Sequence, residues 1–293
     1  MGLGWAMVGC DRPAGEATAA RHVHETRGEV REIAADRRTA VIRHDEIPGY
    51  MPRMTMDLNV RDTNELAGVQ AGDVVTFRLL ADDATHWIDN LRVVGRVHAP
   101  EDEGIDPEEA AFTLLPVREL NPGDLAPDVE FLDENGRVQR FSRLAGRAVA
   151  FSFIFTRCPL PDFCPLMNRS FAEARRLLRA DSKAPTNWFF LSLSFDPEFD
   201  RPPVLRAYAR GYRGADEDRW RFAVLGTNAI ARLAPALDLR LIREQGSISH
   251  NLRTVVLDPQ GRIHRQFDGN RWTARDLADA LIEAAGKVKH TNP

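Results

Sequence analysis

The segment 148–180 constrains the fold most, because it combines a strand, a loop with two cysteines and a helix. Residues 148–155 form a run that is apolar except for Ser152 and rich in aromatic and β-branched side chains, which predicts a strand buried on both faces. Cys158 and Cys164 follow in a proline-rich loop, and apolar residues then recur at helical spacing over 166–180. This order predicts two thiols beside a helix N-terminus, where the peptide dipole lowers thiol pKa values and favours thiolate.

Two cysteines in one loop also have simpler explanations. A cysteine can be a small buried hydrophobe, and a pair can form an inert structural disulfide. Cys158 and Cys164 are the only cysteines after Cys10, and the prolines around them argue against a core-filling role. We therefore predict a functional dithiol, with the structural disulfide as the alternative.

The loop sequence, Thr156-Arg157-Cys158-Pro159 and then Cys164-Pro165, resembles the copper-site loop of the SCO/SenC family. These are thioredoxin-fold proteins that deliver copper to cytochrome c oxidase. The resemblance implies that Cys158 and Cys164 bind Cu(I) or Cu(II) and can close a disulfide, and that His250 is the third copper ligand. The family loop usually has three residues between its cysteines, whereas this chain has five.

The resemblance covers the chain from about residue 121 to its C-terminal helix, and the element pattern agrees with it. Strands alternate with helices and end in a hairpin, which predicts an α/β sheet of thioredoxin type. The expected helices are 166–180, 201–211, 227–236 and 273–286, and the strands that follow the first are 188–195, 221–225, 253–257 and 262–267. Asp196, in an acidic turn after the second core strand, is expected either to orient the site or to be a turn residue.

The segment 28–97 has a different pattern. Five short strand-like runs are separated by turn signals, which predicts a small antiparallel barrel of OB type. The runs are 29–33, 39–43, 54–60, 74–80 and 87–94. We therefore predict two domains: an all-β barrel at 28–97 and an α/β thioredoxin-like domain at 121–293, joined by an acidic linker at 98–120.

The barrel segment carries a cluster of soft donors, since His44, Met51, Met54 and Met56 fall within thirteen residues. Residues two apart on a strand share a face, so Met54 and Met56 can present two thioethers side by side. Thioethers favour Cu(I), and an imidazole completes such a site. The alternative is a methionine-lined barrel core, because methionine is an ordinary gap filler.

The run 51–56, Met-Pro-Arg-Met-Thr-Met, is similar to the CusF-like family of periplasmic copper-binding barrels. That family has a histidine followed by Trp-Pro-x-Met-Thr-Met. The similarity implies a Cu(I) site made of His44, Met54 and Met56. Met51 stands where the family has its capping tryptophan, and it is either a third sulfur ligand or a cover.

The N-terminal segment 1–27 is interpreted as a residual signal and lipobox followed by a polar tether over 11–26. Met7-Val8-Gly9-Cys10 resembles a bacterial lipobox, which implies lipidation of Cys10, a membrane anchor and a periplasmic or other extracytoplasmic location. The alternative is an inconsequential N-terminal cysteine. His22 and His24 are interpreted as solvated residues of the tether.

The composition limits the function classes. A net charge of -4 and a pI of about 6.1 give no electrostatic reason to expect nucleic acid. No run approaches the length of about 18 apolar residues that a transmembrane helix requires.

The leading hypothesis is an extracytoplasmic copper metallochaperone. Its expected partners are a copper-accepting protein, namely a cytochrome c oxidase subunit, and a thiol reductant. One alternative is an enzyme, a thiol-disulfide oxidoreductase that reduces the cysteines of a copper-site partner. The other is a copper-sequestering resistance protein. Delivery and reduction both need a reducible thiol pair near the partner, so the sequence leaves this choice open.

Overall fold

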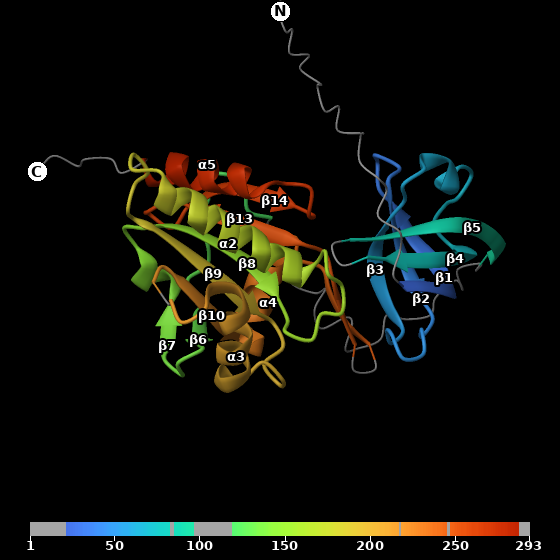
Figure 1. The fold of residues 1–293 in the computed structure, drawn as a ribbon, viewed down its shortest axis with the longest axis horizontal. Helices are drawn as coiled ribbons and strands as arrows, with labels where there is room; N and C mark the ends of the chain where they lie inside the picture. The colour runs from blue at the N-terminus through green and yellow to red at the C-terminus, as the bar shows by residue number, and fades with distance from the viewer. Residues whose placement is uncertain (1–21, 83–84, 97–118, 217, 245–246, 287–293) are drawn as a thin grey trace, which may run out of the picture.

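The computed structural model describes residues 22–82, 85–96, 119–216, 218–244 and 247–286, which form two units lying side by side (Figure 1). One contains a five-stranded sheet and the other a seven-stranded sheet with helices. The predicted fold class, a small β-barrel followed by a thioredoxin-like α/β domain, is confirmed. Most of the predicted linker and all residues before 22 lie outside the described residues.

The N-terminal unit is an antiparallel sheet with the strand order β3-β2-β1-β4-β5. A bridge between Val60 and Ile88 brings the end of β3 to β5 and closes the sheet into a barrel. Buried and half-buried side chains alternate along the strands, as the two-residue period of a sheet requires. Its elements are β1 (His22–Ile33), β2 (Thr39–His44), β3 (Met54–Asn59), η1 (Thr63–Leu66), β4 (Asp73–Ala81) and β5 (His86–Arg96).

Strand β1 begins at His22, well before the predicted start at residue 29. Residues 22–29 pair with β4 throughout, so the prediction of a tether was wrong for 22–26. The ring of His24 stacks on that of Tyr50, with 4.2 Å between centroids, so His24 is not a solvated bystander. Polar residues dominate this half of β1 because little of it is covered, and the apolar pattern that marks a strand is therefore missing.

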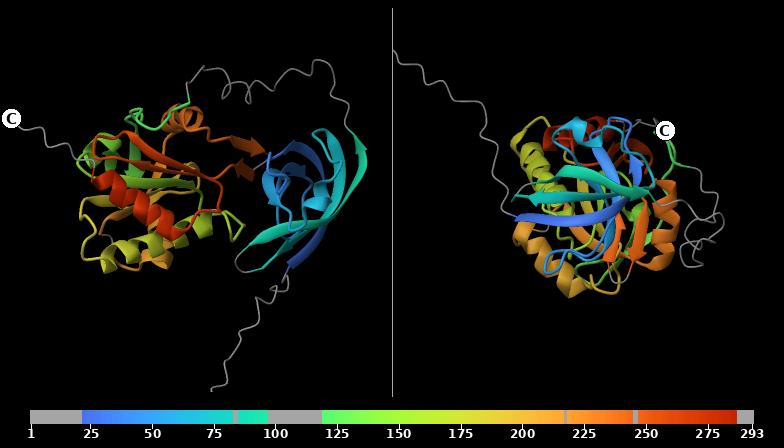
Figure 2. Two further views of the ribbon diagram at one scale, coloured as in Figure 1. Left: turned by 90° about the horizontal axis from the view of Figure 1, so that it is seen from above. Right: turned by 90° about the vertical axis from the view of Figure 1, so that its right-hand side faces the viewer.

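The α/β domain is built on the strand order β14-β13-β8-β9-β10-β6-β7. The central strands β8, β9 and β10 are parallel, and every residue of β8 is buried, as predicted; every residue of β9 is buried as well. Helices α4 and α5 lie on opposite sides of the sheet (Figure 2). The strands are β6 (Glu130–Asp133), β7 (Val138–Arg140), β8 (Ala148–Ile154), β9 (Trp188–Ser194), β10 (Trp220–Leu225), β13 (Arg253–Leu257) and β14 (Ile263–Asp268), and the helical segments are η2 (Phe141–Leu144), α2 (Cys164–Ala180), α3 (Pro202–Arg213), α4 (Thr227–Ala236) and α5 (Ala274–Ala285).

A second, two-stranded sheet was not predicted. Strands β11 (Leu241–Glu244) and β12 (Ser247–His250) form a hairpin that leaves the main sheet and extends to the barrel (Figure 2). There β12 contacts β3. Each strand is only four residues long, which is too short for a periodic signal, and the hairpin depends on its neighbours for burial.

One hydrophobic cluster spans the boundary between the two domains. Apolar residues of the barrel, including Ile42, Leu58 and Ile88, belong to it. Four α/β-domain residues pack into the same cluster and are at most 5% exposed: Leu160, Phe163, Met167 and Leu252. The domains are therefore docked through buried apolar surface, which stabilises the contact by about 25 cal/mol for each Å² removed from water.

Gly28 provides a test of how tightly β1 and β2 pack. A Cβ atom at this position would lie 2.6 Å from Ile42 Cγ2 and 2.8 Å from the Arg43 carbonyl oxygen. We expect Gly28→Ala to destabilise the barrel by about 1–3 kcal/mol, because backbone has to move. Amide hydrogen exchange of β1 and β2 measures the change in the barrel alone.

Gly95→Ala is the matched control, since Gly95 lies in a strand of the same sheet and its Cβ would meet only Val74 Cβ, at 3.9 Å. Its effect should stay within about 0.5 kcal/mol. Equal protection in the two variants would contradict the close approach of β1 and β2.

Candidate metal centres

The two cysteines lie in the loop that connects β8 to α2. Cys158 is half-buried, and Cys164, the first residue of α2, is fully buried. The loop turns back on itself through backbone bonds, because Cys158 N–H donates to the Phe155 carbonyl at 3.3 Å and Phe163 N–H donates to the Leu160 carbonyl at 3.2 Å. Both thiols are free, and each affects the pKa of the other.

The pKa values of the two thiols are shifted in opposite directions. Burial raises the pKa of Cys164 well above the ordinary value, and the neighbouring Cys158 adds to the effect. Burial also acts to raise the pKa of Cys158, but hydrogen bonds with the Cys164 side chain and with the backbone of Cys164 and Leu160 outweigh it, so this pKa is lowered. The prediction that the helix dipole lowers both pKa values was wrong for Cys164, because desolvation of a thiolate exceeds the dipole effect.

His250 is the last residue of β12 and reaches the cysteine loop. Its Nε2 atom lies 3.7 Å from Cys164 Sγ, and its Nδ1–H donates to the Asn251 carbonyl at 2.8 Å. Burial lowers the pKa of His250 to about 4, so the ring is neutral at pH 7. The Nε2 lone pair is therefore directed at the sulfur, which is the arrangement a metal-binding imidazole requires.

Aromatic rings enclose this imidazole. Phe195, Phe155 and Phe163 meet it edge to face, with centroid separations of 4.7, 5.8 and 6.2 Å. Such a shell excludes water and fixes the ring. The structure thus brings Cys164 and His250 together and places Cys158 beside Cys164. In the described part of the chain no three His, Cys, Asp or Glu side chains converge closely enough to hold a metal ion as they stand.

Two carboxylates support the start of the loop, and sequence reasoning had singled out only Asp196. Asp196 is 1% exposed and receives a hydrogen bond from Arg157 at 2.7 Å, so it positions the residue next to Cys158. Asp200, which was missed, accepts bonds from Thr156 N–H at 3.0 Å and from the Thr156 hydroxyl. Asp200 follows Asp196 by four residues in the same acidic turn, and that proximity was the available signal.

The soft donors of the barrel are also buried together. His44 ends β2 and lies opposite Met54 in the register of β2 with β3, while Met51, Met54 and Met56 are at most 4% exposed. All three methionines belong to the core cluster, as the core alternative required. Burial of the methionines alone therefore fits both interpretations.

His44 separates the two interpretations. Its Nδ1 bonds the Asp45 carbonyl oxygen at 2.6 Å, whereas its buried Nε2 has no hydrogen-bond partner among the described residues. Burial lowers the pKa of His44, which keeps the ring neutral. A buried polar atom without a partner costs about 1–3 kcal/mol, so the unused lone pair of a histidine that pairs with Met54 across the strands favours the ligand interpretation.

Comparison with known protein families finds a separate match for each of the two domains. Residues 23–92 match the family described as copper binding periplasmic protein CusF, and residues 117–286 match SCO1/SenC. The chain is 23% identical to the SCO1 protein homolog of Bacillus subtilis over 163 residues, which cover 54% of this chain and 81% of that protein.

Two solved structures with Sco proteins in their names are similar to this chain. A SCO1/SenC family lipoprotein from Bacillus anthracis is 21% identical, with a TM-score of 0.50, and the match covers 58% of this chain and 99% of that one. Copper-bound ScoI of Arabidopsis thaliana is 17% identical, with a TM-score of 0.48, and covers 55% and 98%. With the SCO1/SenC match extending over more than half of its length, the chain belongs to the SCO1/SenC family and carries a CusF-like domain at its N-terminal side.

Proposed function

We propose that this protein is an extracytoplasmic copper metallochaperone that holds copper at two sites and delivers it during cytochrome c oxidase assembly. The observation that carries the proposal is the neutral His250 imidazole, whose free nitrogen lies 3.7 Å from a buried cysteine sulfur in the loop that resembles the family's copper site. Cys158, Cys164 and His250 are the proposed ligands of this thiolate site. Copper is its cargo.

The two donor sets differ in the copper oxidation states that they bind. Two thiolates and an imidazole accept both Cu(I) and Cu(II), whereas neutral thioethers with an imidazole favour Cu(I). We assign the second, barrel site to His44, Met54 and Met56, with Met51 as a cover or third sulfur. The orphaned His44 Nε2 is the specific support for this assignment.

The proposed location follows from the matches rather than from the fold. The CusF family is described as periplasmic, and one similar structure is that of a lipoprotein. Cys10, the proposed lipidation site, lies outside the described residues. Over the residues that the structure describes, none of the helices has the length and apolar character needed to cross a bilayer.

A second candidate function is thiol-disulfide exchange with the copper-site cysteines of a partner. The unequal thiols favour it, since Cys158 is half-buried with a lowered pKa while Cys164 is fully buried with a raised one. Such a pair has the form of an attacking and a resolving cysteine. A third candidate, copper sequestration without delivery, predicts that loaded protein does not load an oxidase copper-site domain lacking metal.

The thiolate site predicts a spectroscopic result. The reduced protein should bind one Cu(II) with strong sulfur-to-copper charge-transfer absorption, because thiolate is easily oxidised. Cys158→Ser or Cys164→Ser should abolish this band, and His250→Ala should weaken copper binding by at least about tenfold.

The control variant is His264→Ala, because His264 lies on β14 beside Glu283 and away from the cysteine loop. Its titration should match that of the wild type. Full-affinity copper binding by Cys158→Ser would remove the thiolate site from the proposal.

The barrel site predicts Cu(I) stoichiometry under a competing chelator. Wild type should bind two Cu(I), and Met54→Leu/Met56→Leu and Cys158→Ser/Cys164→Ser should each bind one. Leucine preserves the buried volume, so the loss reports the thioethers rather than packing.

Met167→Leu is the control, since Met167 is a buried methionine of the same cluster outside the proposed site. It should still bind two ions. If the Met54/Met56 variant also binds two, these methionines are core residues only.

The exchange function predicts an order of reaction. Iodoacetamide should alkylate Cys158 well before Cys164 in a Cys10→Ser background, read by peptide mass spectrometry, because Cys158 is half-buried with a lowered pKa whereas Cys164 is fully buried with a raised pKa. A Cys164→Ser variant should accumulate a mixed disulfide with an acceptor, and Cys158→Ser should not. Equal labelling rates would argue against Cys158 as the attacking thiol.

A further inference from the structure

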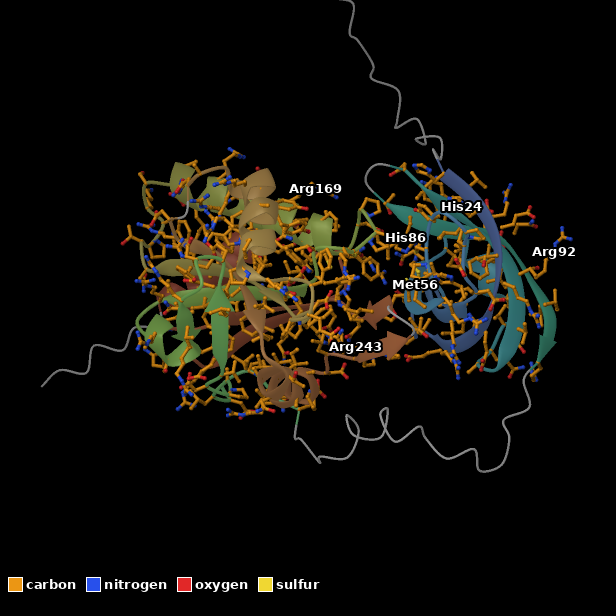
Figure 3. The ribbon with its side chains drawn as sticks, turned by 90° about the horizontal axis from the view of Figure 1, so that it is seen from below. His24, Met56, His86, Arg92, Arg169 and Arg243 are labelled. Atoms are coloured by element: carbon orange, nitrogen blue, oxygen red, sulfur yellow. The ribbon has the colours of Figure 1, made fainter. Side chains whose placement is uncertain are left out.

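The two proposed metal sites lie on elements that meet across the domain boundary. Strand β3, which carries Met54 and Met56, contacts β12, which ends in His250. Cys158 packs against the same cluster of buried residues to which the barrel methionines belong. Figure 3 shows Met56 and His86 on the side of the barrel that is turned to the α/β domain.

The residues between the cysteines make this contact. We call residues 160–163 the docking segment, because Leu160 and Phe163 are buried in the barrel cluster at 1% and 5% exposure. The Phe163 ring lies between two imidazoles, with centroids 5.5 Å from that of His86 in the barrel and 6.2 Å from that of His250. The long spacer thus reaches the barrel while its two ends carry the proposed copper ligands.

A polar bridge crosses the interface at the same place. Asp162 accepts hydrogen bonds from His86 Nδ1 at 2.5 Å, from His86 N–H at 3.2 Å and from the Thr85 hydroxyl at 3.3 Å. The other ring nitrogen of His86 lies 3.3 Å from the Asp57 carbonyl oxygen. Asp57 directly follows Met56, and Asp162 precedes Cys164 by two residues. One imidazole therefore links the strand of one proposed site to the loop of the other.

We propose that the docked arrangement is a transfer complex within one chain, in which Cu(I) passes directly from the His44, Met54 and Met56 set to the thiolate site. The inference rests on the proposed function. The His86–Asp162 contact is the latch that seats the docking segment. Copper remains Cu(I), neutral thioether and imidazole donors are released, and each cysteine thiol that binds loses one proton to solvent.

The direction of transfer follows from donor charge. Thiolates are anionic soft donors and hold Cu(I) more tightly than neutral thioethers do, so transfer to the cysteines is downhill. One donor of each set is covered while the domains are docked, with His44 at 1% and Cys164 at 0% exposure, and Cys158 is half-buried. Most of the donors are therefore shielded from bulk water during the transfer. Tethering adds an effective concentration on the order of millimolar, which makes transfer in cis faster than transfer between molecules.

The experiment starts from protein with the Cys158–Cys164 disulfide closed and one Cu(I) in the barrel. A phosphine reductant and excess bathocuproine disulfonate, a Cu(I) chelator, are then added together. The coloured chelator complex and the ultraviolet Cu(I)–thiolate band are followed in time. In wild type most copper should appear in the thiolate band, at a rate independent of protein concentration, and the chelator should capture at least tenfold less than from Cys158→Ser/Cys164→Ser.

The comparison in trans mixes two full-length variants. Copper-loaded Cys158→Ser/Cys164→Ser is the donor, and reduced Met54→Leu/Met56→Leu is the acceptor. Transfer between them should slow in proportion to dilution, and the chelator should intercept it. If wild type loses copper to the chelator as fast as the donor variant does, direct transfer is overturned.

The latch is tested from both sides of the interface. His86→Gln and Asp162→Asn should each raise the share of copper captured by the chelator severalfold, while chelator titration still finds two sites. Glu32→Gln is the control, because it removes an exposed interdomain ion pair, Glu32 with Arg240 at 2.9 Å, and should behave as wild type. If both latch variants still bind two Cu(I) ions and lose no more copper to the chelator than wild type does, the His86–Asp162 contact is not a latch. Wild type that binds fewer than two Cu(I) ions overturns the proposed function and this inference together.

Discussion

A carboxylate buried at a domain boundary needs hydrogen-bond donors. Those of Asp162, in the cysteine loop, come from Thr85 and His86 of the barrel. Its side chain is 3% exposed, and its oxygens accept three hydrogen bonds from Thr85 and His86. Removing one partner of such a buried pair costs about 3–5 kcal/mol, because an uncompensated charge stays behind. The position of the cysteine loop therefore depends on the barrel as well as on the α/β domain.

This dependence explains why the cores of the two domains merge. Leu160 and Phe163, on either side of Pro161 and Asp162, insert into the barrel cluster, and the β11–β12 hairpin approaches β3 next to them. The polar bridge fixes the register of the contact, and the apolar residues supply most of its stabilisation. As a result, all the proposed donors except the half-buried Cys158 lie out of water, and burial keeps the His44 and His250 imidazoles neutral.

Much of the architecture was predictable because local pattern reports local structure. The apolar run before Cys158 indicated a central strand, and the alternation of strands and helices indicated the thioredoxin-like domain. Ligand candidates were also visible, since cysteine, methionine and histidine are soft-metal donors and fall close together in two short segments. The hairpin that carries His250 and the first half of β1 gave no such pattern, because the neighbours that stabilise them are distant in sequence.

The sequence by itself determined which donors the chain possesses and which folds carry them. Only the tertiary structure decided how they act. It lowered the pKa of Cys158 and raised that of Cys164, since burial and the hydrogen bonds that offset it depend on what surrounds each sulfur and not on its place in the loop. It also gave the five-residue spacer its role, because the partner of Asp162 is an imidazole 76 residues earlier in the chain. Burial and long-range pairing are set by how distant segments meet, and no local pattern encodes that meeting.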